Sequence, residues 1–152
     1  MEESISILQQ IKGVFCLEMK DINTYSPLTL AFIGDSIFDL VIRSIVVCNA
    51  NTSANQLHKY TSRIVKAPSQ ARIMNVIMEQ LSEEEIQIYK RGRNAKSASS
   101  AKNASLSDYK RATGFEALIG YLYLQERYER LLELIDEGLK DEFFTEWMKD
   151  GK

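Results

Sequence analysis

Three charged residues interrupt an otherwise apolar stretch between Leu28 and Val47. Asp35, Asp39 and Arg43 are spaced four residues apart, so a helix would place them in one polar stripe. Asp39 and Arg43 can then pair with each other, whereas Asp35 has no local counter-charge. A carboxylate on a core helix needs a partner because burying a bare charge is costly. The candidate partners of Asp35 are a cation from elsewhere in the chain, backbone donors or a metal ion.

A second apolar stretch also carries a single carboxylate. Residues 112–124 contain one charge, that of Glu116, and Gly120 would lie one turn later on the same helical face. A glycine there lets another helix approach closely. If that helix carries Asp35, the two carboxylates face each other and repel unless a cation lies between them. Oxygen ligands with room for water suit Mg²⁺. The alternative is that each acid pairs with an arginine or lysine from a neighbouring helix.

A basic segment directly precedes the Glu116 stretch. Between residues 90 and 111 the chain has seven basic residues against one acid, Asp108. Cations beside a carboxylate pair suit phosphodiester hydrolysis, because they bind the phosphate backbone while a metal ion activates water. The alternative is a solvated loop whose charges only maintain solubility. The basic residues are Lys90, Arg91, Arg93, Lys96, Lys102, Lys110 and Arg111.

The elements that must position these residues are all expected to be helices. Apolar residues recur at helical spacing, and no segment alternates in the manner of a strand, which predicts an all-α fold. Ser26-Pro27, Ser53 with Gln56, and Ser82 with Glu85 are helix-start signals. The expected elements are a helix at 3–19, a loop at 21–26, a buried helix from 26 to about 48, a helix from 53, a further helix after Pro68 reaching Leu81, a short helix from 82 that stops at Gly92, a surface loop at 93–106, a helix from about 107 through 123, and one or two terminal helices up to Phe143.

Composition limits the remaining possibilities. The chain has 152 residues, 45% of them hydrophobic, which predicts one domain spanning 1–152 with a substantial core. The net charge of −2 by itself gives no indication of nucleic-acid binding.

Cys16 and Cys48 lack the spacing of a metal or disulfide site, so we expect buried thiols. His58 is the only histidine, and a Ser-His-Asp triad could form only through it. Without a signal peptide or an apolar run of membrane-spanning length, we expect a cytoplasmic protein with no membrane association.

Two motifs resemble those of a known enzyme family. The run from Phe32 to Ile42, Phe-Ile-Gly-Asp-Ser-Ile-Phe-Asp-Leu-Val-Ile, resembles the signature of ribonuclease III catalytic domains. The run Phe-Glu-Ala-Leu-Ile-Gly-Tyr-Leu, which begins at Phe115, resembles their second motif. Other segments resemble the Mini-ribonuclease III branch, whose members consist of the catalytic domain alone, without a double-stranded-RNA-binding domain. The resemblance covers about residues 28–132. The segments that resemble this branch are 55–59, 62–65, 83–85, 90–97, 102–103 and Tyr109.

The resemblance implies a ribonuclease III endonuclease-domain-like helical bundle and an Mg²⁺-dependent endoribonuclease, with Mn²⁺ as a substitute. Such an enzyme cleaves double-stranded RNA to leave 5′-phosphate and 3′-hydroxyl ends, and the typical substrate of the branch is precursor large-subunit (23S) ribosomal RNA. Asp35 and Glu116 would be the catalytic metal ligands. We also expect a homodimer, because cutting both strands requires two sites related by a two-fold axis. A ribosomal protein that presents the substrate is a candidate partner. The implied RNA-binding residues are Arg91, Arg93, Asn94, Lys96, Lys102, Lys110 and Arg111.

The chain departs from the family pattern at three places. Ala31 stands where full-length ribonucleases III have a Glu, and Thr113 stands where they have an Asp. Mini-ribonucleases III share these losses, which leaves Asp35 and Glu116 as the matched acids. The chain reads Lys66-Ala-Pro68 where relatives tend to carry a lysine after Val-Ser-Ala. The alternative function is a non-catalytic helical adaptor, in which the acids form buried ion pairs and the loop binds RNA or protein without cleaving it.

Overall fold

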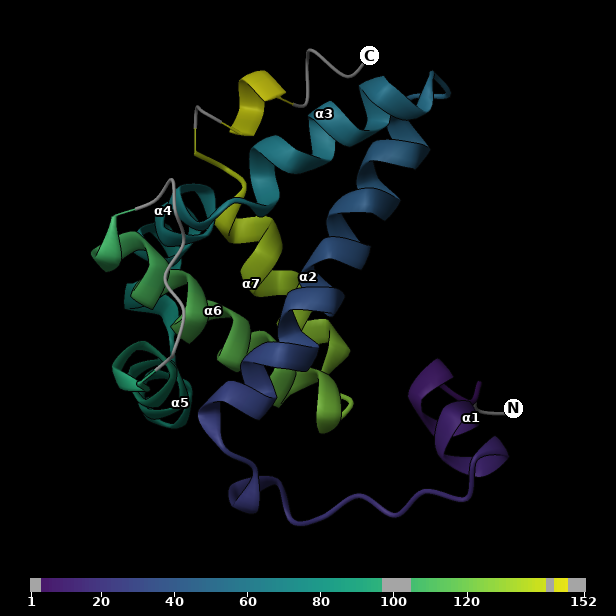
Figure 1. Ribbon diagram of the computed structural model, residues 1–152, viewed down its shortest axis with the longest axis vertical. Coiled ribbons are helices and arrows are strands. Elements are labelled where there is room, and N and C mark those ends of the chain that lie inside the picture. Colours follow the sequence, from purple (N-terminus) through teal and green to yellow (C-terminus); the bar gives the residue numbers. More distant parts are fainter. Residues whose placement is uncertain (1–3, 97–104, 142–143, 148–152) are drawn as a thin grey trace.

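The computed structural model describes residues 4–96, 105–141 and 144–147, and the described residues contain helices and no strand (Figure 1). The predicted all-α fold is therefore confirmed. A further helical turn lies at 144–147. The helices are α1 (Ile7–Val14), α2 (Pro27–Asn49), α3 (Ala54–Val65), α4 (Ala67–Ile77), α5 (Glu83–Asn94), α6 (Leu106–Leu124) and α7 (Tyr128–Gly138), with 3₁₀ turns η1 (Ile22–Thr24) and η2 (Met78–Gln80).

Helix α6 lies at the centre of the bundle and packs against α2, α4, α5 and α7. Phe115, Leu118 and Leu122 on α6 are fully buried, because nearly every side of this helix is apolar and is covered by a neighbour. Phe38 on α2 meets Phe115 edge to face, with ring centroids 5.1 Å apart. The two helices that carry Asp35 and Glu116 therefore cross in the core.

The helix starts expected from the sequence are present. The Ser26 hydroxyl accepts from the Thr29 amide, and Pro27 begins α2. The Ser82 and Glu85 side chains form a complete capping box at the start of α5. The Ser53 hydroxyl accepts from the amide of the residue three positions later, at the start of α3. These local signals determine where the helices begin.

Several details differ from the expectations. The first helix is shorter than 3–19, because a capping box at Ser6 starts it and Cys16 adopts a left-handed conformation (φ 53°) after it ends. Helix α5 continues past Gly92 to Asn94, since Gly92 is buried against α6 rather than ending the helix. Cys16 and Cys48 are both exposed, because one follows α1 and the other lies in the last turn of α2.

Helix α1 lies apart from the other helices and is joined to α2 by an extended segment (Figure 1). Its Leu8 is buried, and the Ser6 hydroxyl donates to Glu126 Oε1 at 2.7 Å. Ile7, Val14 and Phe15 remain exposed. None of the described helices has both the length and the apolar character needed to cross a bilayer.

Candidate active site

The crossing of α2 and α6 is unusually close because a glycine from each helix lies at the contact. A Cβ atom at Gly34 would be 1.7 Å from the carbonyl oxygen of Glu116, and one at Gly120 would be 2.0 Å from that of Leu30. No side chain fits in either space. The sequence indicated close approach at Gly120 but gave no separate sign for Gly34. The backbones therefore meet at the residues beside the two carboxylates.

Asp35 and Glu116 interact directly across this crossing. Burial, together with the side-chain hydrogen bond and the negative charge of Asp35, raises the pKa of Glu116 to about 9. Glu116 is partly buried, whereas Asp35 is exposed on α2. The sequence-based expectation that these side chains face each other agrees with this geometry. At neutral pH Glu116 is consequently protonated in the metal-free protein.

Neither carboxylate has a basic partner within the described residues. The nearest charged neighbours on α2 are already paired with each other, since Arg43 Nε donates to Asp39 Oδ2 at 2.8 Å. The described ion pairs otherwise involve acids on α5 and α7 and Asp141. An ion-pair role for Asp35 and Glu116 therefore finds no support in this part of the chain.

The donor set suits a hard divalent cation. Two neighbouring carboxylates, one of them exposed, provide oxygen ligands while leaving coordination positions for water, as Mg²⁺ requires. Ala31 is buried one turn before Asp35, and the Thr113 hydroxyl donates to the Tyr109 carbonyl at 3.0 Å, so neither adds a carboxylate. Across the described ranges no cluster of three or more His, Cys, Asp or Glu residues could hold a metal ion. Asp35 and Glu116 would thus be the protein ligands.

The end of α5 places basic side chains beside α6. A Cβ atom at Gly92 would lie 2.8 Å from the Ala117 Cβ atom, and one at Gly114 would lie 2.7 Å from the Tyr89 ring. These glycines let α5 and α6 pack in close contact. The Arg93 guanidinium lies over the Tyr89 ring at 5.7 Å, and its Nε donates to Asn94 Oδ1 at 3.3 Å. The remaining candidates here, Arg91, Asn94 and Lys96, are exposed.

The start of α6 supplies the other candidate RNA-binding residues. Lys110 is exposed, whereas Arg111 is half-buried and donates from Nη1 to Asn75 Oδ1 of α4 at 3.2 Å. Lys110 precedes Glu116 by six residues, or about 9 Å along a helix that rises 1.5 Å per residue. Lys102 lies outside the described residues. Among the described residues, the candidate basic side chains therefore lie near the end of α5 and in the first turns of α6, the helix that carries Glu116.

Two supporting contacts were not expected from the sequence. Arg130 of α7 donates from Nε to Glu85 Oε2 at 2.8 Å and from Nη2 to Glu85 Oε1 at 2.9 Å. The Arg130 guanidinium lowers the pKa of Glu85, the residue that caps α5. This network fixes the start of α5. The hydrogen bond from Arg111 to Asn75 was also not predicted, because two residues that are 36 positions apart along the chain leave no local pattern.

Comparisons with known proteins agree with this architecture. The Ribonuclease III domain model matches residues 28–127. A Mini-ribonuclease 3 of Clostridium tetani is 49% identical over 117 residues, covering 76% of this chain and 78% of the relative. A Mini-ribonuclease 3 of Brevibacillus brevis is 48% identical over 119 residues, covering 78% of this chain and 89% of the relative. A crystal structure of a Fusobacterium nucleatum protein superposes with a TM-score of 0.72 at 36% identity, covering 78% of this chain and 96% of that one.

The chain therefore belongs to the ribonuclease III family and is an endoribonuclease. Within that family, the resemblance of its motifs to the Mini-ribonuclease III branch is confirmed by these relatives. The ribonuclease III-like helical fold expected from the sequence is confirmed as well.

Proposed function

We propose that this chain cleaves double-stranded RNA with a divalent cation held by Asp35 and Glu116. The observation that carries the proposal is the direct contact of these carboxylates, which have no basic partner in the described residues. The same helix α6 carries the exposed Lys110 in its first turns. Mg²⁺ is the proposed ion, with Mn²⁺ as a substitute. When bound, such an ion activates water for attack on phosphorus and stabilises the leaving oxygen.

The chain's own residues bind and orient the RNA. Arg91, Arg93, Asn94 and Lys96 at the end of α5, with Lys110 and Arg111 on α6, would contact the phosphate backbone, as would Lys102 of the connecting segment. Such contacts depend on charge and are independent of base identity. Bases in an A-form duplex are hard to reach, so we infer recognition mainly of helix shape.

The natural substrate that we propose is precursor 23S ribosomal RNA, with a single catalytic domain spanning 1–152 as the working enzyme. The affinity of this domain for generic duplexes should be modest. A ribosomal protein that holds the precursor in a suitable shape is a proposed helper. Adding purified ribosomal proteins to a cleavage assay on precursor RNA tests this part of the proposal.

We also propose a two-fold homodimer as the active form, because one site cuts one strand of the duplex. Exposed apolar residues on α2 support this proposal. The Phe32 side chain is 79% exposed, three residues before Asp35 on the same helix, and Leu28, Leu40 and Val47 are also exposed. Exposed apolar side chains that gather on one helix are typical of a protein interface.

Cleavage of duplex RNA labelled at either end tests the proposed function. We expect cuts that depend on Mg²⁺, leave 5′-phosphate and 3′-hydroxyl ends, and stop when a chelator is added. A non-catalytic adaptor would bind the duplex and leave it intact under all of these conditions. Intact RNA after incubation with folded protein and Mg²⁺ or Mn²⁺ would overturn the proposal.

A further inference from the structure

A second basic surface lies where α2 meets α3, outside the residues used above. Between Leu40 and Met78 the chain contains no Asp or Glu. The same stretch carries His58 and five permanently basic residues, of which Arg43 is paired with Asp39 and Arg72 with Asp141. The five basic residues are Arg43, Lys59, Arg63, Lys66 and Arg72.

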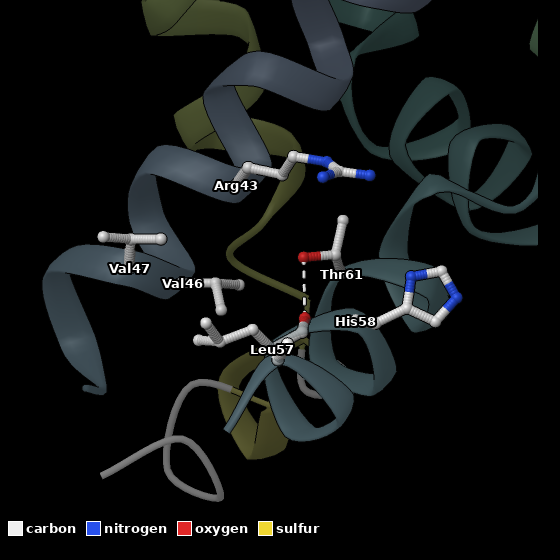
Figure 2. A pocket seen from close by; sticks show the side chains of 7 residues that line it. Arg43, Val46, Val47, Leu57, His58 and Thr61 are labelled. Atoms are coloured by element: carbon white, nitrogen blue, oxygen red, sulfur yellow. Dashed lines mark hydrogen bonds between the residues drawn. The ribbon is translucent and has the colours of Figure 1, made fainter. Parts of the chain in front are cut away.

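An open pocket in this surface has basic side chains at its rim. The apolar part of its lining is formed by Val46, Val47, Ala54 and Leu57, and the polar part by Arg43, His58 and Thr61. Figure 2 shows Arg43 reaching from α2 and His58 from α3, on either side of Thr61. The Thr61 hydroxyl donates to the Leu57 carbonyl at 2.9 Å, so it does not donate into the pocket. The nitrogen donors at this rim suit an anion.

Arg43 can bind a further anion without leaving its present position. Its side chain is 61% exposed, and the described contact with Asp39 uses Nε. A guanidinium carries five N–H donors, and its terminal nitrogens match the spacing of two phosphate oxygens. Lys59, the neighbour of His58 on α3, is exposed and adds a second permanent charge.

The pocket and the carboxylate pair lie along the same stripe of α2. Arg43 follows Asp35 by eight residues, or about 12 Å of helix at a rise of 1.5 Å per residue. Figure 1 shows α6 running from the crossing toward the side where α4 and α5 lie, whereas α2 runs from it toward α3. The carboxylate pair consequently has a basic surface on each of two sides. A stiff RNA duplex whose phosphate lies at the pair would continue past it in both directions.

We propose that Arg43, His58 and Lys59 form a second binding surface for the phosphate backbone of duplex RNA. The proposal rests on the proposed function, because it names a further contact with the same substrate. An acidic protein would match the charge equally well, but the position of Arg43 beside the cleavage site favours the RNA. The contacts would strengthen binding to all sequences alike, since phosphates carry no base information.

Binding of duplex RNA by the double variant Arg43→Ala/Lys59→Ala tests this inference. Fluorescence anisotropy in chelator measures the dissociation constant without cleavage, over a range of salt concentrations. Each lost phosphate contact should reduce the slope of log affinity against log salt concentration by about one. It should also weaken the affinity by about fivefold to tenfold at 0.1 M salt. Lys140→Ala is the matched control, because Lys140 is an exposed lysine just after α7 that pairs with Glu137 at 2.7 Å.

A further variant separates an RNA contact from a structural role of Arg43. Asp39→Asn removes the negative charge that pairs with Arg43 and leaves the positive charge of Arg43 in place, so RNA binding should be unchanged or tighter. Equal losses in Asp39→Asn and Arg43→Ala would show that the ion pair only supports the helix, which would overturn the inference. The same conclusion follows if Arg43→Ala/Lys59→Ala binds as tightly as Lys140→Ala.

The triple variant Arg91→Ala/Arg93→Ala/Lys96→Ala, assayed in parallel, distinguishes the two proposals. If it binds weakly, the wild type cleaves with Mg²⁺, and Arg43→Ala/Lys59→Ala matches the wild type, then only the second surface is wrong. If no variant changes binding and the wild type leaves duplex RNA intact, the proposed function fails and the second surface fails with it.

Discussion

The main chain of Glu116 occupies the space beside Gly34 that a side chain would need. A Cβ atom at residue 34 would lie 1.7 Å from the Glu116 carbonyl oxygen and 2.8 Å from the Gly120 nitrogen. Because Asp35 follows Gly34, this contact determines how far its carboxylate lies from that of Glu116. The glycine thus links helix packing to the proposed metal site.

Gly34→Ala should consequently damage both stability and cleavage. The added methyl group meets backbone atoms that cannot rotate away, so we expect a loss of about 2–3 kcal/mol in the free energy of unfolding. Displacement of α2 from α6 should also lower Mg²⁺-dependent cleavage by at least tenfold. Gly13→Ala on α1 is the control, since nothing lies within 4 Å of its Cβ position. It should change stability by less than about 1 kcal/mol. Equal behaviour of the two variants would contradict the packing role of Gly34.

Asp35→Asn and Glu116→Gln should each abolish cleavage while leaving the fold and RNA binding intact. The amides keep the size of the side chains but remove a charge that would neutralise the cation, at a cost of several kcal/mol in the reaction barrier. The metal-free variants should be as stable as the wild type or more so, because a neutral amide avoids the cost of burying two neighbouring acids. Thermal melts in chelator beside cleavage assays check both parts. Variants that melt far lower yet still cut RNA would refute the assignment.

The affinity for Mg²⁺ should rise with pH up to about 9. The pKa of Glu116 is raised to about 9 by burial and by Asp35, so a bound cation must displace its proton below that pH. Calorimetry in two buffers of different ionisation enthalpy should detect release of about one proton per ion near pH 7. Binding without proton release and without pH dependence would argue against Glu116 as a ligand.

The stability of the metal-free protein should fall over the same pH range. The folded pKa of Glu116, about 9, lies above its ordinary value of 4.5, so between these values the fold holds a proton that the unfolded chain has lost. The free energy of unfolding therefore decreases as pH rises through this interval. Glu116→Gln should flatten this dependence in denaturant titrations between pH 5 and 9. A curve identical to that of the wild type would contradict the raised pKa.

Replacing Arg91, Arg93 and Lys96 with alanine should weaken binding to all duplex sequences alike and reduce its salt dependence. These side chains are proposed to contact phosphates, whose counterions are released on binding. Titrations of two unrelated duplexes at several salt concentrations provide the measurement. If affinity and salt dependence stay at wild-type values, the segment is only a solvated, solubilising surface.

Sedimentation equilibrium at micromolar concentration should give twice the 17.4 kDa mass of the chain. Phe32→Glu should shift the protein toward the monomer, because a charge would replace an exposed aromatic side chain in the proposed interface. Val14→Glu makes the same change at another exposed apolar residue, on α1, and should stay dimeric. A monomeric wild type would rule out the proposed dimer.

The sequence predicted the helices well, because helix starts and apolar spacing leave local patterns, whereas the role of the two carboxylates stays a prediction. Ser26-Pro27 and Ser82 with Glu85 start helices through contacts within one turn, and Gly120 indicated where a neighbour approaches Glu116. Contacts between distant segments were not predictable in this way. Gly92 resembled a helix end but proved to be a packing residue against α6. Arg130 with Glu85 and Arg111 with Asn75 are ordinary surface residue types until the fold brings them together.

A crystal structure of the protein soaked in Mn²⁺ tests the central proposal most directly. Anomalous scattering locates the ion without reference to the protein ligands. We predict a peak within coordination distance of both the Asp35 and Glu116 carboxylates, with water in the remaining positions. Absence of a peak there, in crystals of a preparation that cleaves duplex RNA with Mn²⁺, would contradict the proposal that these two residues hold the catalytic metal.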